Sequence, residues 1–203
     1  MSRLVLVRHG ETVWHDGNRY AGRTDIALTE KGIAQAQRLG IWAAGANLAA
    51  VWSSPLQRAI RTAEPAAAAA GLALQIDPRL IELDFGRGEG LTDAEMASAF
   101  PDERAAFVQA PATHWLPGGE DPALAAARAL DALRHIADTP GRSLVVAHNT
   151  LFRLVLCHVL GIPLDRYRRV FPSLANGTLT ELEVSTAGEI ALLMFNAPLE
   201  RGG

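Results

Sequence analysis

The feature that most constrains the fold is a series of short apolar runs, separated from one another by stretches with a helical pattern. Residues 4–7 (LVLV) and 143–147 (SLVVA) are continuous Leu- and Val-rich runs, which suit strands buried on both faces of a parallel sheet. Residues 50–52 are predicted to form a further strand, and residues 74–76 a weaker one. Strands that alternate with helices indicate the α/β class.

The stretches between the apolar runs carry helix signals. Thr29 is predicted to cap the first helix. The buried stripe of this helix is predicted to comprise Ile33, Ala36, Leu39 and Ala43. A second helix is predicted to have Pro55 in its first turn and to stop at Gly71. Another helix is predicted over residues 120–138.

The C-terminal part completes the expected architecture. Residues 178–184 and 190–195 alternate in polarity around an Ala-Gly turn signal, which predicts an antiparallel hairpin. We therefore expect a three-layer α/β/α sandwich, with a mostly parallel sheet and an antiparallel edge strand. No internal repeat or linker-like composition interrupts the chain, so residues 1–203 are predicted to form a single domain. The Ala- and Pro-rich stretch at about 92–122 is expected to hold one or two helices and to cover the ligand pocket.

Composition excludes several classes of partner. The chain has 19 Lys and Arg against 22 Asp and Glu, a net charge of −3, whereas a domain that binds duplex nucleic acid usually has a basic excess. No stretch approaches the ~20 apolar residues of a membrane span, and no signal-peptide pattern is found. We therefore expect a cytoplasmic protein with neither nucleic acid nor membrane as partner. The single cysteine, Cys157, lies in an apolar run and is predicted to be a buried hydrophobic residue.

Polar residues gather where the predicted strands end. Ligands of an open parallel sheet bind at the carboxyl ends of its strands. The first strand leads into the segment RHGET at residues 8–12, and the second into Ser53-Ser54 and then Arg58. The 143–147 strand leads into His148-Asn149 at a helix N-terminus, and Glu82 precedes a glycine-rich stretch. These residues are predicted to meet at one edge of the sheet.

This set of side chains suits phosphoryl transfer. Arginine matches a phosphate edge in bidentate fashion, and a helix N-terminus donates backbone N–H groups to the same anion. Arg8 and Arg58 are expected to lower the pKa of His9, and a neutral imidazole can attack phosphorus. Glu82 is a candidate proton donor, a role worth roughly 10²–10⁴-fold in rate. His148, if protonated, would stabilise negative charge on the equatorial oxygens.

Each of these residues also has a structural interpretation when taken alone. Asn149 can serve as a helix cap, Arg58 can pair with Glu64, and Glu82 can be a solvated loop residue. The chemical hypothesis therefore depends on their convergence at one edge. It requires no metal and no cofactor. The histidines include no H-x-x-H or H-E-x-x-H spacing, which disfavours a metal hydrolase.

Four blocks of the sequence resemble the histidine phosphatase superfamily, the phosphoglycerate-mutase-like proteins. The first block comprises RHGET at residues 8–12 and RYAG at 19–22, and the second is SSPLQRA at 53–59. The third block is LIELDFG at 80–86, and the fourth is VVAH at 145–148. An RHG triplet alone is weakly specific, whereas four blocks in the family's order are strongly so.

The resemblance implies a role for the chemical residues in these blocks. His9 would be the phosphorylated nucleophile, Glu82 would be the proton donor, and Arg8, Arg58 and His148 would complete the phosphate pocket. The resemblance implies a substrate-binding set of Arg8, His15, Ala21, Gly22, Arg58 and Asn149. Two positions depart from the common pattern: many members have asparagine in place of His15, and glycine is common in place of Asn149.

The function that these features predict is hydrolysis of a small phosphorylated metabolite through a phosphohistidine, in a protein of the phosphatase branch. The first alternative is a cofactor-dependent phosphoglycerate mutase. Mutases of the family are typically longer, so the short chain favours a phosphatase. The second alternative is a catalytically silent, phosphate-binding regulatory module, which the intact set of chemical residues disfavours. Homodimers are common in the family, so a homodimer is one expected assembly.

Substrate specificity is expected to come from the segment between Glu82 and His148. Three aromatic residues of this segment, Phe100, Phe107 and Trp115, either line the pocket or belong to the core. Sugar phosphates, phosphoglycerate derivatives, phosphoserine and α-ribazole phosphate all remain open as substrates.

Overall fold

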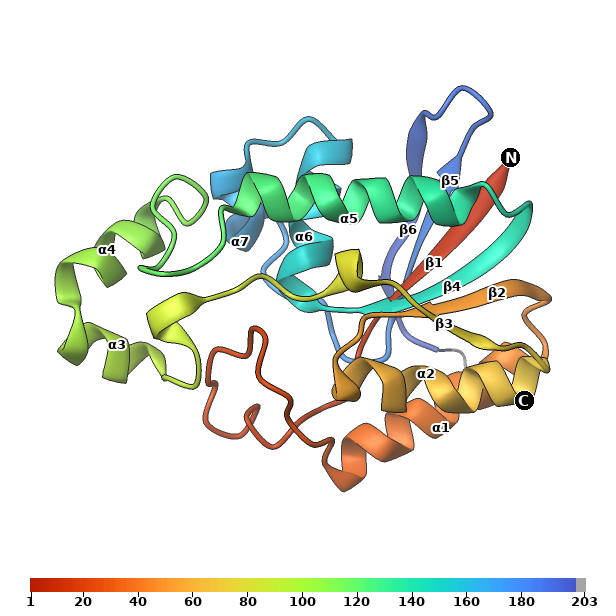
Figure 1. The fold of residues 1–203 in the computed structure, drawn as a ribbon, viewed down its shortest axis with the longest axis horizontal. Coiled ribbons are helices and arrows are strands. Elements are labelled where there is room, and N and C mark those ends of the chain that lie inside the picture. The colour runs from red at the N-terminus through yellow and green to blue at the C-terminus, as the bar shows by residue number, and fades with distance from the viewer. Residues whose placement is uncertain (200–203) are drawn as a thin grey trace.

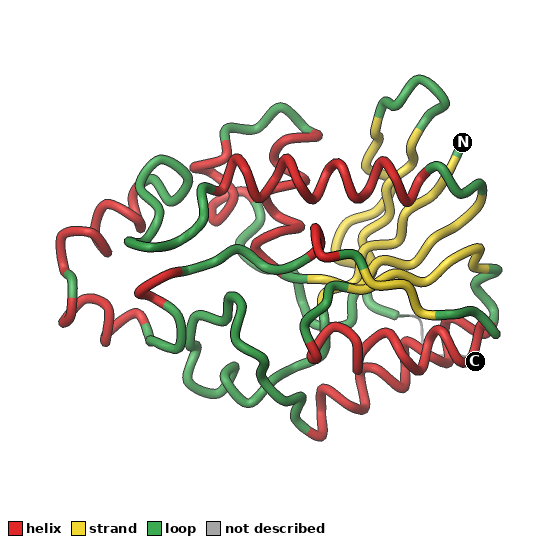
Figure 2. The backbone as a smooth tube through the Cα atoms, viewed as in Figure 1, coloured by secondary structure: helices red, strands yellow, loops and turns green. Residues whose placement is uncertain are grey.

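A single six-stranded sheet organises the molecule, in the strand order β3-β2-β4-β1-β5-β6 (Figures 1 and 2). The computed structural model describes residues 1–199. The strands are β1 (Ser2–Arg8), β2 (Leu48–Ser53), β3 (Leu74–Ile76), β4 (Gly141–Ala147), β5 (Leu179–Val184) and β6 (Ile190–Ala197). Strands β1 to β4 pair in parallel, β5 pairs antiparallel with β1, and β6 pairs antiparallel with β5. The predicted mostly parallel sheet is confirmed. The strand that runs opposite to the others is β5, which lies between β1 and the edge strand β6.

Helices cover both faces of this sheet. The helices of the described chain are α1 (Glu30–Ala44), α2 (Gln57–Ala70), α3 (Asp93–Ala99), α4 (Pro101–Gln109), α5 (Pro122–Ala137), α6 (Asn149–Val159) and α7 (Tyr167–Val170). In Figure 1, α1 and α2 lie on one side of the sheet and α5 and α6 on the other. The predicted three-layer α/β/α arrangement is therefore confirmed.

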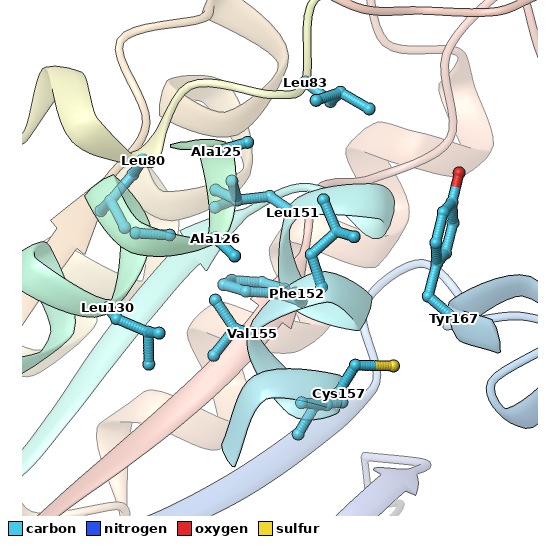
Figure 3. Packing of buried hydrophobic residues seen from close by; sticks show 14 of the residues in the cluster. Leu80, Leu83, Ala125, Ala126, Leu130, Leu151, Phe152, Val155, Cys157 and Tyr167 are labelled. Atoms are coloured by element: carbon cyan, nitrogen blue, oxygen red, sulfur yellow. The ribbon is translucent and has the colours of Figure 1, made fainter. Parts of the chain in front are cut away.

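Strand β1 shows why the apolar run is continuous. Leu4 and Leu6 belong to the hydrophobic cluster beneath α5 and α6, whereas Val5 and Val7 belong to the cluster beneath α1 and α2. Because successive side chains of a strand point to opposite faces, a sheet covered on both faces requires apolar residues at every position. Figure 3 shows the α6 side of this core, where Cys157 is fully buried as predicted.

Helix α1 differs from its predicted stripe at one position. Thr29 caps it as expected, its side chain accepting a hydrogen bond from the Gly32 backbone N–H. Ile33, however, is 49% exposed. The buried face instead includes Gly32 and Gly40, and Gly40 faces Pro65 of α2. These glycines let α1 approach its neighbours closely, so the contact face is centred on small residues and leaves Ile33 at its rim.

The start of α2 also differs from expectation. The helix begins at Gln57, so Pro55 precedes the N-cap residue Leu56 and does not lie in the first turn. The predicted stop is confirmed, since Gly71 caps α2 in the left-handed conformation with φ of 67°. Within residues 1–199 no helix has both the length and the apolar character needed to cross a membrane.

Candidate active site

Three adjacent strands bring their following residues together at one edge of the sheet. β1 lies beside β4, and β4 beside β2. The backbone N–H of His9 donates to Ala147 O at 3.0 Å, and that of Ser54 donates to Val146 O at 3.0 Å, which continues the strand pairing into the loops. As a result, the imidazole centroids of His9 and His148 lie 5.2 Å apart. The predicted convergence of these strand ends is therefore present in the fold.

His9 is held as a neutral imidazole with one free nitrogen. The ring is 4% exposed, and its Nδ1 lies 2.8 Å from the carbonyl oxygen of Gly10. Because a carbonyl can only accept, this hydrogen bond assigns the ring proton to Nδ1 and leaves a lone pair on Nε2. Burial, followed by the charges of Arg58 and Arg8, holds the pKa of His9 well below its usual range. The geometry suits a nucleophile.

Arg58 is anchored by backbone carbonyls of the loop before α1. Its Nη1 donates to Thr24 O at 2.7 Å, and its Nη2 donates to Gly22 O at 2.6 Å and to Ala21 O at 3.4 Å. Its Nε is buried and has no hydrogen-bond partner among residues 1–199. Glu64, the alternative partner considered from the sequence, instead pairs with Arg61 at 3.3 Å. Ala21 and Gly22 thus hold the guanidinium in place through their carbonyl groups.

Arg8 is held by a different set of acceptors. Its Nη1 donates to Leu174 O at 2.7 Å, and its Nη2 lies 2.7 Å from His15 Nε2. A guanidinium can only donate, so His15 Nε2 accepts from Arg8. On the other side of the ring, Nδ1 lies 2.9 Å from Thr12 Oγ1 and 3.1 Å from the Thr12 backbone nitrogen. Burial, then the charge of Arg8, lowers the pKa of His15 to about 4, which keeps this acceptor available. His15 therefore orients Arg8, and the substrate-binding role that the resemblance implies for His15 stays a prediction.

His148 is the N-cap residue of α6 and is completely buried. Its Nε2 lies 2.7 Å from Ser54 Oγ, and its Nδ1 is buried with no partner within residues 1–199. Burial, then the charge of Arg58, holds the pKa of His148 well below its usual range. His148 is therefore neutral, in contrast to the protonated form considered from the sequence.

Glu82 lies against the first turn of α6. Its Oε1 accepts hydrogen bonds from the N–H groups of Leu83 and Leu151, both at 2.9 Å, and its Oε2 accepts from that of Thr150 at 3.0 Å. The side chain is 4% exposed, and burial raises the pKa of its carboxyl despite these hydrogen bonds. Glu82 is not a solvated loop residue, and a carboxyl group of this kind can hold and release a proton in its pocket.

These groups adjoin a cavity of about 350 Å³. Of the predicted site residues, the cavity is lined by Arg8, His9, His15, Ala21, Glu82 and Asn149. Gly22, Arg58 and His148 are not among the lining residues, and the last two are at most 1% exposed. The Asn149 amide oxygen accepts the N–H of Leu174 at 3.3 Å, so this side chain also ties α6 to the segment before β5.

Sequence reasoning missed several residues of the cavity wall. They are Trp14, Asn18, Arg19, Tyr20, Phe85, Asp93, Thr150, Arg153 and Arg168. Arg19, Tyr20 and Phe85 lie inside the recognised sequence blocks, which is the signal that could have found them. Phe100 and Phe107 are buried in the core and Trp115 is 41% exposed, so none of these three aromatic residues lines the cavity.

The remaining expectations concern coverage and metals. The stretch 92–122 contributes Asp93 to the lining of the cavity. The expectation that this stretch covers a bound substrate stays a prediction. Within residues 1–199 no group of three or more His, Cys, Asp or Glu side chains is arranged to hold a metal ion.

The fold and this arrangement of two histidines, two arginines and a glutamate define a class of protein. Residues 4–197 match the family model described as "Histidine phosphatase superfamily (branch 1)". The chain belongs to this superfamily, and the prediction of a phosphatase of this class is confirmed at that level.

Individual relatives show how much of the chain is shared. The chain is 33% identical to a probable phosphoglycerate mutase GpmB from Erwinia tasmaniensis, over 95% of both chains. It is 31% identical to phosphoserine phosphatase 1 from Hydrogenobacter thermophilus, over 82% of this chain and 80% of that one. The solved structure of Bacillus stearothermophilus YhfR superposes with a TM-score of 0.91 at 31% identity, over 98% of this chain and all of that one. The match to GpmB over nearly its full length removes chain length as an argument against a mutase.

Proposed function

We propose that this protein hydrolyses a phosphate monoester of a small metabolite, with His9 as the nucleophile. One observation carries the proposal. Arg8 Nε, Arg58 Nε and His148 Nδ1 are all buried beside His9 and have no hydrogen-bond partner within residues 1–199. Buried polar groups without partners are rare, because each costs about 1–3 kcal/mol. A phosphoryl group bound at His9 would supply acceptor oxygens to these nitrogens.

The first chemical step follows from the protonation states. His9 Nε2 attacks phosphorus with its lone pair, a P–N bond forms, and the P–O bond to the leaving group breaks. Glu82 gives a proton to the departing oxygen, and burial supports this role because it raises the pKa of the Glu82 carboxyl. Arg8 and Arg58 stabilise the charge on the equatorial oxygens, so these side chains supply the positive charge that the step needs.

The second step returns the enzyme to its starting state. Water attacks the phosphohistidine, Glu82 accepts a proton from this water, and the P–N bond breaks. Orthophosphate leaves, and His9 regains its lone pair on Nε2. The same carboxyl therefore acts first as acid and then as base, in accordance with microscopic reversibility.

The intermediate provides the test. The protein is incubated with a ³²P-labelled phosphate monoester and quenched, and the bound label is assayed at acidic and alkaline pH. We expect an alkali-stable, acid-labile adduct on His9, and we expect His9→Ala to lose both adduct and turnover. His158→Ala is the matched control, since His158 is exposed on α6. Turnover retained in His9→Ala, or a label on another residue, would contradict the proposal.

A phosphoglycerate mutase is the second candidate, because relatives named probable phosphoglycerate mutase match over nearly their whole length. Incubation with 3-phosphoglycerate, with and without a bisphosphate primer, separates the two. We expect free phosphate as the main product in both reactions. Accumulation of 2-phosphoglycerate that depends on the primer would favour the mutase. A silent binding module predicts no release of p-nitrophenol from p-nitrophenyl phosphate.

A further inference from the structure

The cavity wall beyond His9 carries two arginines that the proposed phosphoryl chemistry does not use. Arg153 comes from α6, one turn after Asn149, and Arg168 comes from α7. Arg153 is 5% exposed, and its Nε is buried with no hydrogen-bond partner in the described part of the chain. Its guanidinium carbon lies 4.8 Å from the centre of the Tyr167 ring. A buried guanidinium that rests on an aromatic ring and forms no ion pair with a carboxylate of residues 1–199 is expected to bind an anion.

Arg168 is held at the same wall by aromatic residues. Its Nη2 lies 2.5 Å from the hydroxyl oxygen of Tyr20, and its guanidinium carbon lies 4.9 Å from the centre of the Phe107 ring. The positive charge of Arg168 is among the causes that lower the pKa of Arg153, after burial of the Arg153 side chain. Two like charges held close together are stabilised when an anion binds between them.

The other charged side chains of this wall already have partners. Arg19 pairs with Glu95 at 2.8 Å, and Asp93 accepts a hydrogen bond from Arg104 Nε at 3.0 Å. Glu82 is engaged by backbone N–H groups of the α6 turn. Among residues 1–199, the charged side chains of this part of the wall that have no ion-pair partner, Arg153 and Arg168, are therefore positive.

This pair adjoins the groups around His9. The charges that act on His9 are chiefly those of Arg58 and Arg8. Arg153 packs on Tyr167, and its charge is, after burial, among the causes that lower the pKa of Arg8. One cavity of about 350 Å³ contains both regions, which is at the small end of ligand pockets. A substituent of a small molecule bound at His9 would share this cavity with the arginine pair.

We propose that Arg153 and Arg168 form a second anion subsite, and that the substrate is a phosphate monoester with a second anionic group, a carboxylate or another phosphate. This inference rests on the proposed function, because it places the scissile phosphoryl group at His9. Charge-assisted hydrogen bonds to such a group strengthen binding by about 1.5–3 kcal/mol, or roughly 10- to 100-fold.

Matched substrates test the subsite. 3-Phosphoglycerate and glycerol 3-phosphate differ only in a carboxylate against a hydroxymethyl group, and propane-1,3-diol bisphosphate and monophosphate differ by the second phosphate. We expect kcat/KM to be at least about tenfold higher for the anionic member of one or both pairs. A preference in the first pair alone assigns a carboxylate, and one in the second pair alone assigns a phosphate. No preference in either pair overturns the inference.

Arginine variants then locate the preference. In Arg153→Met the ratio of kcat/KM within the preferred pair is expected to fall to about two or less. Arg169→Met is the matched control, because Arg169 is the exposed neighbour of Arg168 on α7, and the ratio should stay at the wild-type value. If Arg153→Met does not fold, the same ratio of kcat/KM is measured in Arg168→Met, because Arg168 is only half-buried. An unchanged ratio in the folded arginine variant overturns the inference.

Failure of this inference is distinguishable from failure of the proposed function. Wild-type protein that hydrolyses p-nitrophenyl phosphate but shows no preference within either pair retains the proposed function and loses the second subsite. Wild-type protein that hydrolyses none of these esters contradicts both. Equal losses on both members of a pair in Arg153→Met would assign Arg153 to the phosphoryl group and overturn the second subsite.

Discussion

His9, His15 and His148 lie near one another, but each has a different partner. His9 Nδ1 donates to a backbone carbonyl, His15 Nε2 accepts from Arg8, and His148 Nε2 bonds Ser54 Oγ. Burial is the largest cause that lowers the pKa of all three rings. Similar side chains therefore take the roles of proposed nucleophile (His9), positioning residue (His15) and buried neighbour of the nucleophile (His148) because of the atoms they contact.

The proposed role of Glu82 as general acid predicts a dependence of the rate on the leaving group. Glu82→Gln cannot donate a proton, so hydrolysis of an alkyl phosphate should slow by about 10²-fold or more. p-Nitrophenyl phosphate should be affected much less, because nitrophenolate leaves without protonation. The measurement is kcat/KM for both esters with the same preparation, so that the nitrophenyl ester also reports on folding. Equal losses on the two esters would contradict the acid role.

The neutral histidines predict a dependence of stability on pH. The pKa of His15 is about 4 in the folded chain and near its usual ~6.5 in the unfolded chain. Between these values the unfolded chain binds a proton that the folded chain does not, so the unfolding free energy falls as the pH drops from 6.5 towards 4. Thermal denaturation between pH 7 and pH 4.5 should therefore show a smaller decline of Tm in His15→Asn than in wild type.

Other buried groups also titrate in this range. His9 and His148 contribute with the same sign as His15, and Glu82, whose pKa is raised, contributes with the opposite sign. Comparison of wild type with His15→Asn isolates the contribution of His15, because the other three groups are present in both proteins. Parallel curves of Tm against pH would show that His15 is not held neutral by the fold.

At the scale of elements, the packing of α1 against the turn after His9 places the nucleophile. A methyl group at Gly32 would overlap the carbonyl oxygen of Glu11, and one at Gly10 would lie 2.6 Å from Gly32 O. The backbone of this turn and that of α1 are therefore in direct contact. Only hydrogen at these two Cα positions permits this approach.

Gly32→Ala is expected to destabilise the protein by about 1–3 kcal/mol, because the turn must shift to accept the methyl group. It should also lower kcat, since the same turn carries His9. Urea unfolding and steady-state kinetics measure the two effects. Gly45→Ala is the matched control, because Gly45 caps the other end of α1 at negative φ and has no atom within 4 Å of the added methyl position. Similar effects of the two substitutions would rule out the contact as the cause.

At this scale the sequence was a good guide to the type of each element and a weaker guide to its contacts. The cap at Thr29 and the stop at Gly71 are local features, so they were readable from a few neighbouring residues. The exposure of Ile33 and the four-residue helix α7 were not. Both depend on which distant segment lies opposite, and periodicity within one helix carries no information about that.

At the scale of the whole molecule, the pocket joins elements that are distant in the chain. Its polar groups come from the ends of β1, β2 and β4, from the start of α6 and from the loop before α1. A ligand that binds only the folded chain must therefore stabilise all of these elements together. Orthophosphate, which is the proposed product, is the simplest such ligand.

Orthophosphate at 100 times its Kd should stabilise the protein by about 2.7 kcal/mol, which corresponds to a rise in Tm of roughly 5–11 °C at this chain length. Arg58→Met should lose most of this rise, because it removes the unpartnered Nε from the pocket. Arg61→Met, on the exposed side of α2, should keep it. The measurement is the difference in Tm with and without phosphate for each variant. An unchanged rise in Arg58→Met would place the bound phosphate elsewhere.

The sequence by itself determined the α/β class, the order of the main elements and the rim at which His9, Arg58, Glu82 and His148 meet. It did so because strand patterns, caps and the position of residues after parallel strands depend on neighbours in the chain. Only the tertiary structure decided which atoms each histidine contacts, that His15 orients Arg8, and that the buried Nε of Arg153 has no hydrogen-bond partner within residues 1–199. These properties depend on atoms that packing brings together from distant parts of the chain, and no local pattern specifies them.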